Sequence, residues 1–223
     1  MNVNLKENYI KVLNDYNQSP FSKSDGWKCV YEEYTLTQIR LIYNTLQKGD
    51  NLLDIGTGHG IVPIFFKKNN YEVCTIDHFE TGGEALKNIA LFNIQTKNVN
   101  LNDGKLPFKD KSFNLIYMGD VIEHLPNSPK KILKECHRIL KDNGSLIIST
   151  PNSIRLINKL KLLIGVSVWP KIESFYEDDY NGTHHHEYTL NELYFVMNKN
   201  HFKIDNVIYF EQNLHSDKRL KSI

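Results

Sequence analysis

A short apolar segment that runs directly into a glycine-rich turn constrains this chain more than any other feature. Residues 52–60 read LLDIGTGHG, so Asp54 is followed by three glycines at every second position. The next segment, IVPIFFKKNN, is typical of a buried helix, and its Pro63 is tolerated in a first helical turn. A strand, a glycine turn and a helix form the opening unit of a parallel α/β sheet, in which this turn faces a ligand.

The alternation of strands and helices continues along most of the chain. After a strand at 51–55 we expect strands at 71–77, 98–102, 112–118, 145–150 and 202–210, with helices at 83–93, 129–141 and 189–200. In the helix over 129–141, Ser128 is the expected N-cap, Pro129 the first helical residue and Gly144 the end. The strands lack the alternation of a one-sided sheet, which predicts a parallel sheet with helices on both faces.

Two segments depart from this order. Residues 1–48 read as helices broken near Ser19-Pro20, and we interpret them as an N-terminal helical cap on a main domain over 49–223. Residues 152–187 read as an insertion at the carboxyl edge of the sheet, where such folds bind ligands. An ordinary long connection is the alternative interpretation of the second segment.

Composition excludes several classes of protein. The 223 residues carry a net charge of +1 without a basic cluster, so a nucleic-acid partner is not expected. No apolar run approaches the roughly 20 residues of a membrane span, and the start lacks the pattern of a signal peptide. Three widely spaced cysteines suit a reducing cytoplasm, with Cys74 and Cys136 as small core residues.

The glycine turn does not match the common nucleotide-binding patterns. A dinucleotide fingerprint would place Gly or Ala at position 61, where this chain has Ile61, and a phosphate loop would need Gly-Lys-Ser/Thr. Asp54 beside the turn would repel a pyrophosphate and attract a cation such as an α-ammonium. The sequence therefore favours a ligand without phosphate.

Two further acidic residues indicate other parts of this ligand. Asp77 ends the second strand, where a carboxylate binds ribose hydroxyls, and Asp103 follows the third, placed to accept a bond from an adenine amino group. Asn-Asp-Gly at 102–104 is also a common turn, so a purely structural Asp103 stays open. An amino-acid end, a ribose and an adenine together describe S-adenosylmethionine.

These residues carry a resemblance to a known family. The motif DIGTGHG, the acid Asp77 and the run from NDGKLPF to IISTPN resemble class I S-adenosylmethionine-dependent methyltransferases, in the subgroup of ubiquinone-pathway and sugar or natural-product O- and N-methyltransferases. The resemblance implies a Rossmann-like, mostly parallel seven-stranded sheet. Six strands can be placed, so a seventh would lie in the tail after Phe210. The cofactor-binding residues expected are Asp54, Gly56, Gly58, Gly60, Asp77, His78, Asp103, Gly104 and Gly119.

The acceptor side is expected after the fourth strand, at Asp120-Val-Ile-Glu123-His124. His124 is the candidate general base, with Glu123 as its catalytic neighbour, because imidazole titrates near neutral pH. A purely structural His124 is the alternative. The spacing also resembles the E-x-x-E-H metal ligands of small-RNA 2′-O-methyltransferases and some quinone O-methyltransferases. Since Asp120 shortens that pattern's first ligand, we predict no metal.

A second cluster, Gly182-Thr-His-His-His-Glu-Tyr, resembles the H-x-R-E-Y-T-L stretch that faces the acceptor in many sugar-type methyltransferases. We expect His184, His186 and Tyr180 to contact the acceptor, with a solvated loop as the alternative. The sequence thus predicts a cytoplasmic enzyme that methylates a hydroxyl of a small molecule, of the sugar or nucleotide-sugar class. An N-methyltransferase and a non-catalytic, cofactor-holding subunit are the alternatives, and the oligomeric state is left open.

Overall fold

The computed structural model contains a five-stranded parallel sheet covered by helices on both faces. It describes residues 4–18, 32–78, 89–169, 176 and 184–210. The strands follow the order β3-β2-β1-β4-β5. Their bounds are Asn51–Ile55 for β1, Glu72–Asp77 for β2, Gln95–Asn98 for β3, Phe113–Gly119 for β4 and Leu140–Ser149 for β5.

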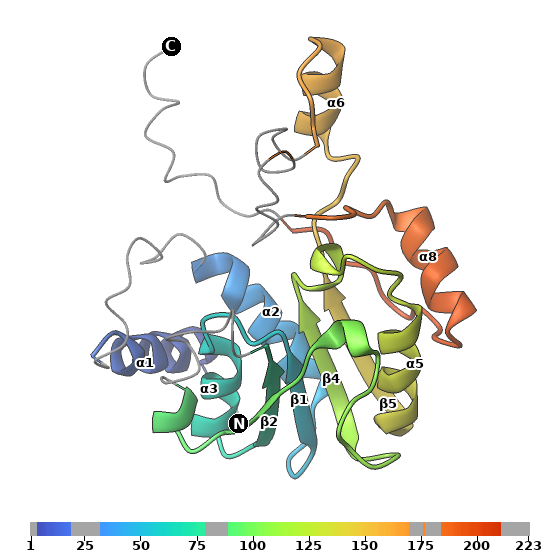
Figure 1. Ribbon diagram of the computed structural model, residues 1–223. Coiled ribbons are helices and arrows are strands. Elements are labelled where there is room, and N and C mark those ends of the chain that lie inside the picture. Colours follow the sequence, from blue (N-terminus) through green and yellow to red (C-terminus); the bar gives the residue numbers. More distant parts are fainter. Residues whose placement is uncertain (1–3, 19–31, 79–88, 170–175, 177–183, 211–223) are drawn as a thin grey trace.

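Alternate residues of the central strands enter two separate cores, as the pleat of a strand requires. Leu53 and Ile116 belong to the core under α5 (Lys130–Ile139) and α8 (Leu190–Lys199). Leu52 and Leu115 belong to the core under α1 (Leu5–Asn17), α2 (Glu32–Thr45) and α3 (Ile61–Lys68). Figure 1 shows these two groups of helices on opposite sides of the sheet. The predicted three-layer arrangement is therefore confirmed, and burial of both faces explains the near-continuous apolar strands.

The third strand lies earlier in the sequence than predicted. We expected 98–102, whereas β3 ends at Asn98 and residues 101–103 form a 3₁₀ turn. Thr96 fixes the register, because the Thr75 hydroxyl donates to its Oγ1 at 2.8 Å. The Asn100 side chain then accepts a bond from the backbone of Asn102, which starts the turn. Asn100, the third residue of the expected strand, caps the 3₁₀ turn, so the strand does not extend through it.

The helix α5 also ends earlier than predicted, at Ile139 rather than before Gly144. The backbone amides of Lys111 and Ser112 bond the carbonyls of Arg138 and Ile139 at 3.1 and 2.7 Å. These bonds terminate the helix and let β5 begin at once, with an irregular register against β4. At its start, Pro129 is the N-cap, one residue later than the predicted Ser128.

Among the described residues, the sheet has fewer strands than predicted. Residues 202–210 were expected to form a strand and form none, although Phe202 and Ile204 pack against the α5 core. A strand needs a hydrogen-bonded neighbour, and no described strand other than β4 pairs with β5. The expected seventh strand falls on residues 211–223, outside the described residues. Most of the helix expected over 83–93 is also outside them.

The segment after β5 leaves the sheet, and its far end returns to the residues that directly follow β5. Residues 153 and 188 are joined by a backbone bond at 3.2 Å, beside a parallel bridge between Asn152 and Tyr188. Between these ends lies α6 (Leu156–Leu163), which projects away from the sheet in Figure 1. The structure does not test the division of the chain at residue 48, which remains a proposal. Cys74 and Cys136 are free and buried, as expected.

Candidate cofactor and acceptor site

The glycine turn after β1 forms the first part of the site. Gly56, Gly58 and Gly60 all have positive φ angles, of 71°, 51° and 77°, a conformation that side chains disfavour. A Cβ on Gly56 would lie 2.3 Å from Val121, and one on Gly60 would lie 2.7 Å from Ile89. A Cβ on Gly58 would meet nothing within 4 Å. Two glycines therefore permit close packing, while Gly58 leaves its backbone open toward a ligand.

Asp54 is the most unusual charged group of the site. Its side chain is only 2% exposed, and Oδ2 has no hydrogen-bond partner within the described part of the chain. Burial, and then the charge of Asp77, raise the pKa of Asp54 to about 8. A buried acceptor without a donor is costly and calls for one from elsewhere. The expected α-ammonium of an amino acid would supply both the donor and the opposite charge.

Asp77 lies at the carboxyl end of β2, next to the glycine turn. Its oxygens accept bonds from the backbone amides of Gly58 at 3.3 Å and His78 at 2.7 Å. Burial raises the pKa of Asp77, while these bonds lower it. The carboxylate thus links the turn to the end of β2 and retains acceptor capacity for ribose hydroxyls.

Asp103 and Gly104 lie apart from this pair, in the exposed 3₁₀ turn after β3. Gly104 adopts a φ of 63°, and a Cβ there would approach Lys131 to 2.5 Å. Gly119 ends β4, where a Cβ would lie 2.0 Å from the Tyr117 hydroxyl. The adenine contact of Asp103 and the cofactor contacts of His78 and Gly119 remain proposals.

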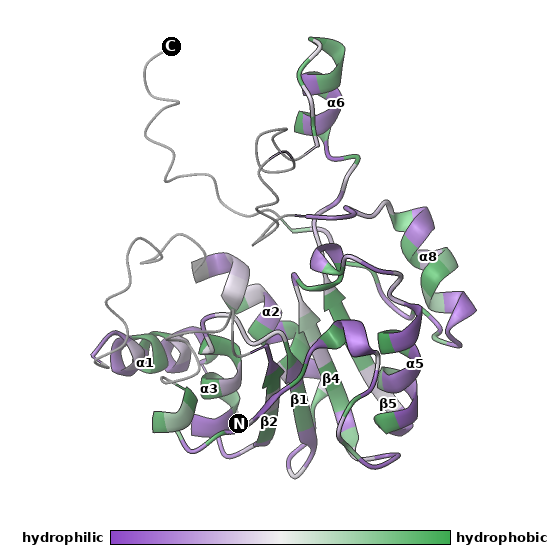
Figure 2. Ribbon diagram, viewed as in Figure 1, coloured by the Kyte–Doolittle hydropathy of each residue, from purple (hydrophilic) through white to green (hydrophobic). Residues whose placement is uncertain are grey.

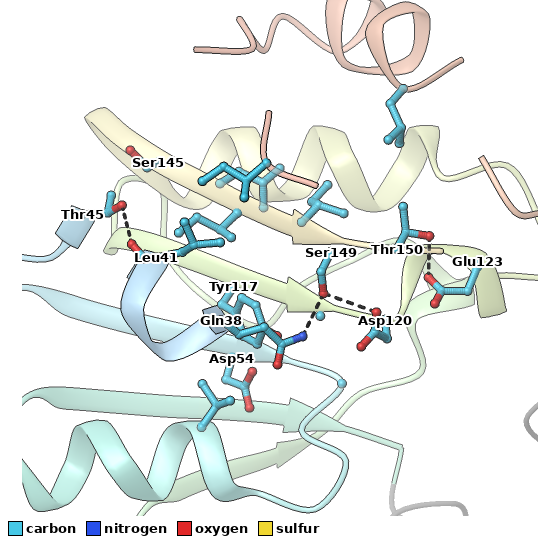
Figure 3. A pocket seen from close by; sticks show the side chains of 18 of the residues that line it. Gln38, Leu41, Thr45, Asp54, Tyr117, Asp120, Glu123, Ser145, Ser149 and Thr150 are labelled. Carbon is cyan, nitrogen blue, oxygen red and sulfur yellow. Dashed lines mark hydrogen bonds between the residues drawn. The ribbon is translucent and has the colours of Figure 1, made fainter. Parts of the chain in front are cut away.

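A network after β4 joins the sheet to the N-terminal helix α2. The Tyr34 hydroxyl lies 2.6 Å from both oxygens of Asp120, whose backbone has a φ of 53°. Ser149 donates to Asp120 at 3.3 Å and accepts from Gln38 at 3.1 Å. Figure 3 shows Gln38 beside Tyr117 and Asp54, with Asp120 beyond Ser149. The carboxylate of Asp120 is therefore engaged with α2 rather than with the histidines.

Sequence reasoning missed Tyr34 and Gln38. Neither residue belongs to a recognisable motif, and the segment around them reads as an ordinary amphipathic helix. Only the packing of α2 across the carboxyl end of the sheet brings them to the site. Ser149, which Gln38 contacts, ends β5 and Thr150 follows it, a position at which a polar residue could have signalled a role.

Glu123 and His124 contact the histidine-rich segment over 184–186. The backbone carbonyl of Glu123 accepts bonds from the amides of His185 at 2.7 Å and His186 at 3.2 Å. These bonds hold the His184 ring against His124, with 4.7 Å between ring centroids. Glu123, His124 and His184 each offer a ligand atom within 4.8 Å of the others.

Each member of this cluster has a defined neighbour. Thr150 donates to Oε2 of Glu123 at 2.9 Å, whereas Oε1 is buried without a partner among the described residues. Burial raises the pKa of Glu123 to about 7. Glu187 lies 2.8 Å from Nδ1 of His184, so Nε2 is the ring nitrogen of His184 that is not engaged with Glu187. His186 instead faces Glu192 at 3.6 Å and stacks edgewise on Tyr188, and Tyr180 is outside the described residues.

Asp54, the glycine turn, Glu123, His124 and His184 line one cavity of about 2510 Å³. This volume exceeds the roughly 300–1,000 Å³ of a usual ligand pocket. The cavity also runs along the whole of β5 and reaches His137 and Arg138 of α5, so only the part at the carboxyl end of the sheet belongs to the site. The glycine turn and the histidines both lie at that end.

Comparison with known proteins identifies the family. Residues 31–207 match a family described as a methyltransferase domain. The chain belongs to this methyltransferase family. The resemblance seen in the sequence is thereby confirmed, and S-adenosylmethionine is the cofactor of such proteins. The buried, unpartnered Oδ2 of Asp54 and the open backbone at Gly58 fit its amino-acid end.

Relatives and solved structures agree with this membership. A ubiquinone biosynthesis O-methyltransferase of Coxiella burnetii is 29% identical over 53% of this chain and 52% of its own length. A probable S-adenosylmethionine-dependent methyltransferase of Mycobacterium tuberculosis is 27% identical over 55% of this chain and 44% of its own. The chain therefore spans about half the length of these relatives.

The fold is also found in a methyltransferase structure from Archaeoglobus fulgidus. Its TM-score is 0.61 at 18% identity, over 80% of this chain and 72% of that one. A methyltransferase structure from Methanosarcina mazei gives 0.57 at 23% identity, over 74% and 85%. Both likenesses concern the fold alone.

The ionisation of Asp54 leads to a testable pH dependence. Its raised pKa means that the free protein holds a proton there below about pH 8. The unfolded chain loses this proton near pH 4, so Asp54 lowers the stability of the free fold progressively as the pH rises from about 4 to about 8. An ammonium beside the carboxylate favours ionisation, so cofactor binding should release this proton. Affinity should then increase with pH from about 6 to 8, by at most about tenfold per unit.

Calorimetry in buffers of different ionisation enthalpy measures this release. Asp54→Asn should bind the cofactor more weakly and release fewer protons, and any release that persists belongs to other groups such as Asp77. Equal proton release by the variant and the wild type would show that Asp54 does not face the ammonium.

Proposed function

We propose that this protein transfers a methyl group from S-adenosylmethionine to a hydroxyl of a small molecule, of the sugar or nucleotide-sugar class. The observation that carries the proposal is the placement of His124 in the same cavity as the glycine turn and Asp54. The acceptor end of this cavity is lined by hydrogen-bonding side chains, including Thr150, Asn152 and His184. Such groups suit an acceptor with several hydroxyls.

The chain's own residues would bind and orient both reactants. When bound, the cofactor supplies a methyl group that its sulfonium has already activated. Asp54 would hold the ammonium, Asp77 the ribose, and the amide of Gly58 would approach closely because no side chain intervenes. Orientation of this kind is worth up to about 7–11 kcal/mol of the barrier.

His124 would accept the proton of the acceptor hydroxyl at a ring nitrogen. The neighbouring ring of His184 limits its rotation, and the short 3₁₀ turn over 122–124 fixes its backbone. Glu123 would support this arrangement through its carbonyl, which holds the histidine-rich segment in place. An amine acceptor, which would need no strong base, is the alternative and predicts little dependence on His124.

The cluster of Glu123, His124 and His184 favours a second candidate, in which a metal ion binds the acceptor oxygen. In the metal-binding interpretation of the sequence Asp120 would be a ligand, but its carboxylate bonds Tyr34 and Ser149 instead. His184 takes the third position. Two imidazoles and one carboxylate suit Zn²⁺ or Mn²⁺ better than Mg²⁺. We retain the metal-free prediction, because Glu123 and His184 are enough to hold His124 in place as a general base without an ion.

A metabolite library tested with methyl-labelled S-adenosylmethionine, with and without a chelator, separates these possibilities. We expect label to appear on a hydroxyl compound and the chelator to leave the rate unchanged. Loss of turnover with the chelator, restored by Zn²⁺ or Mn²⁺, would establish the metal candidate instead. Label on an amine would establish N-methylation, and no label with any acceptor would favour a cofactor-holding subunit.

A further inference from the structure

The helix α6 and the turn after it expose an unusual amount of apolar surface. Leu156, Leu163, Ile164 and Trp169 are 72%, 81%, 76% and 70% exposed. The other exposed apolar residues of the segment are Ile154, Ile157, Leu160, Leu162 and Val166. In Figure 2 the helix stands away from the sheet and the helices that cover it. This surface exceeds the scattered apolar residues that are normal on a protein.

The apolar residues of α6 lie mainly on one side of the helix. At 100° per residue, positions 156, 157, 160, 163 and 164 fall within an arc of roughly 120°. Lys159 and Lys161 flank this arc on either side. Asn158 lies on the opposite side, 3% exposed, where it donates to the Ser153 carbonyl at 2.9 Å. The base of the helix is thus fixed to the domain, while the apolar side is exposed to solvent and its residues Leu156, Ile157 and Leu160 also border the cavity.

The charges of the segment have a single sign. Residues 151–169 include Arg155, Lys159 and Lys161 and contain no acidic residue. A second copy of the chain packed through the same residues would bring its lysines close to these lysines, and residues 151–169 supply no acid to pair with them. An apolar stripe flanked by basic residues, with a nearby tryptophan, instead fits the boundary between lipid tails and anionic head groups.

We propose that α6 and the following turn bind the protein to the surface of a membrane that contains anionic lipids. The apolar side would enter the outer part of the acyl layer, and Lys159 and Lys161 would reach the head groups. This is attachment at the surface: no described helix is long and apolar enough to cross a bilayer. The inference is independent of the proposed methyl acceptor.

The attachment would also place the cavity near the lipid. Arg155, Leu156, Ile157 and Leu160, at the base of α6, line the same cavity as His124 and His184. Leu163, Lys159 and Lys161 do not line it. Changes at these three outer positions therefore test membrane binding without altering the site.

Cosedimentation with lipid vesicles tests the proposal on the whole chain. The wild type should bind vesicles of phosphatidylcholine mixed with phosphatidylglycerol, bind phosphatidylcholine alone much more weakly, and dissociate in high salt. Leu163→Glu should weaken binding at least about tenfold. Phe195→Glu, which changes a residue 63% exposed on α8, should not weaken it. Lys159→Glu combined with Lys161→Glu should weaken it about tenfold or more, and Lys48→Glu should not.

Circular dichroism of each variant establishes that it folds. Equal binding by the wild type and Leu163→Glu, or equal binding to both kinds of vesicle, would overturn the proposal. So would the absence of vesicle binding together with light scattering that shows self-association abolished by Leu163→Glu. In that case α6 would be an interface between copies of the chain.

Discussion

Replacing His124 by alanine should lower the turnover number by about 10²–10⁴-fold while leaving the affinity for S-adenosylhomocysteine unchanged. The size is that of a general base that acts in the transition state. The unchanged affinity follows because the groups proposed to hold the cofactor lie elsewhere: Asp54 on β1, the glycine turn after it and Asp77 on β2, whereas His124 is in the 3₁₀ turn after β4. Steady-state rates with the acceptor identified by labelling, together with calorimetry, measure both quantities.

His137→Ala is the matched control. This histidine packs on Phe202, with 5.4 Å between ring centroids, and has no part in the proposed chemistry. It should retain the wild-type rate. If His124→Ala also turned over near the wild-type rate, His124 would not be the base, and an amine acceptor or a site that only positions its reactants would be favoured.

Asp77→Ala should weaken binding of S-adenosylmethionine by about 10²-fold or more. A carboxylate that accepts two ribose hydroxyls makes two charge-assisted bonds, each worth about 1.5–3 kcal/mol. The change also leaves the amides of Gly58 and His78 without their present acceptor. Asp77→Asn keeps one side-chain oxygen and so separates these contributions. Its affinity for S-adenosylmethionine should lie between those of the wild type and Asp77→Ala.

The control for this prediction is Asp142→Ala. Its side chain is 78% exposed and pairs with Lys111 at the amino end of β5, so cofactor affinity should not change. If the Asp77→Ala protein folds and binds the cofactor as tightly as the wild type, Asp77 does not bind the ribose.

The parts of the fold that depend on local signals could be predicted from the sequence. The strand β1 has the expected bounds, 51–55, because the apolar run ends at Gly56, whose φ of 71° is not that of a strand. The helix α8 starts where expected, since Thr189 and Glu192 form a capping box that the sequence displays. The central strands were recognisable because burial on both faces leaves almost no polar positions in them.

Two of the errors arose where an element depends on residues distant in sequence. The end of α5 is set by amides at 111 and 112, and the strand expected over 202–210 lacks a paired neighbour among the described residues. The alternation of apolar residues in 202–210 gives no information about such a partner. The third strand was misplaced for a local reason, because Asn100 acts as a cap.

The candidate site shows the same division. Asp54, Asp77 and the glycines could be found because their positions relative to the strands carry the chemistry. The meeting of His124 with His184, sixty residues later, could only be suggested, since it depends on how the segment after β5 returns to Glu123. The bond between Tyr34 and Asp120 had no sequence signal, and it changed which residues surround the histidines.

The most direct test of the account is calorimetric titration of the wild-type protein with S-adenosylmethionine and, separately, with NAD. The buried Asp54 beside an open glycine turn should bind the first ligand, with its ammonium, and reject the pyrophosphate of the second. We expect saturable binding of S-adenosylmethionine, accompanied by a higher melting temperature, and no binding of NAD. Binding of NAD without binding of S-adenosylmethionine would contradict the central claim.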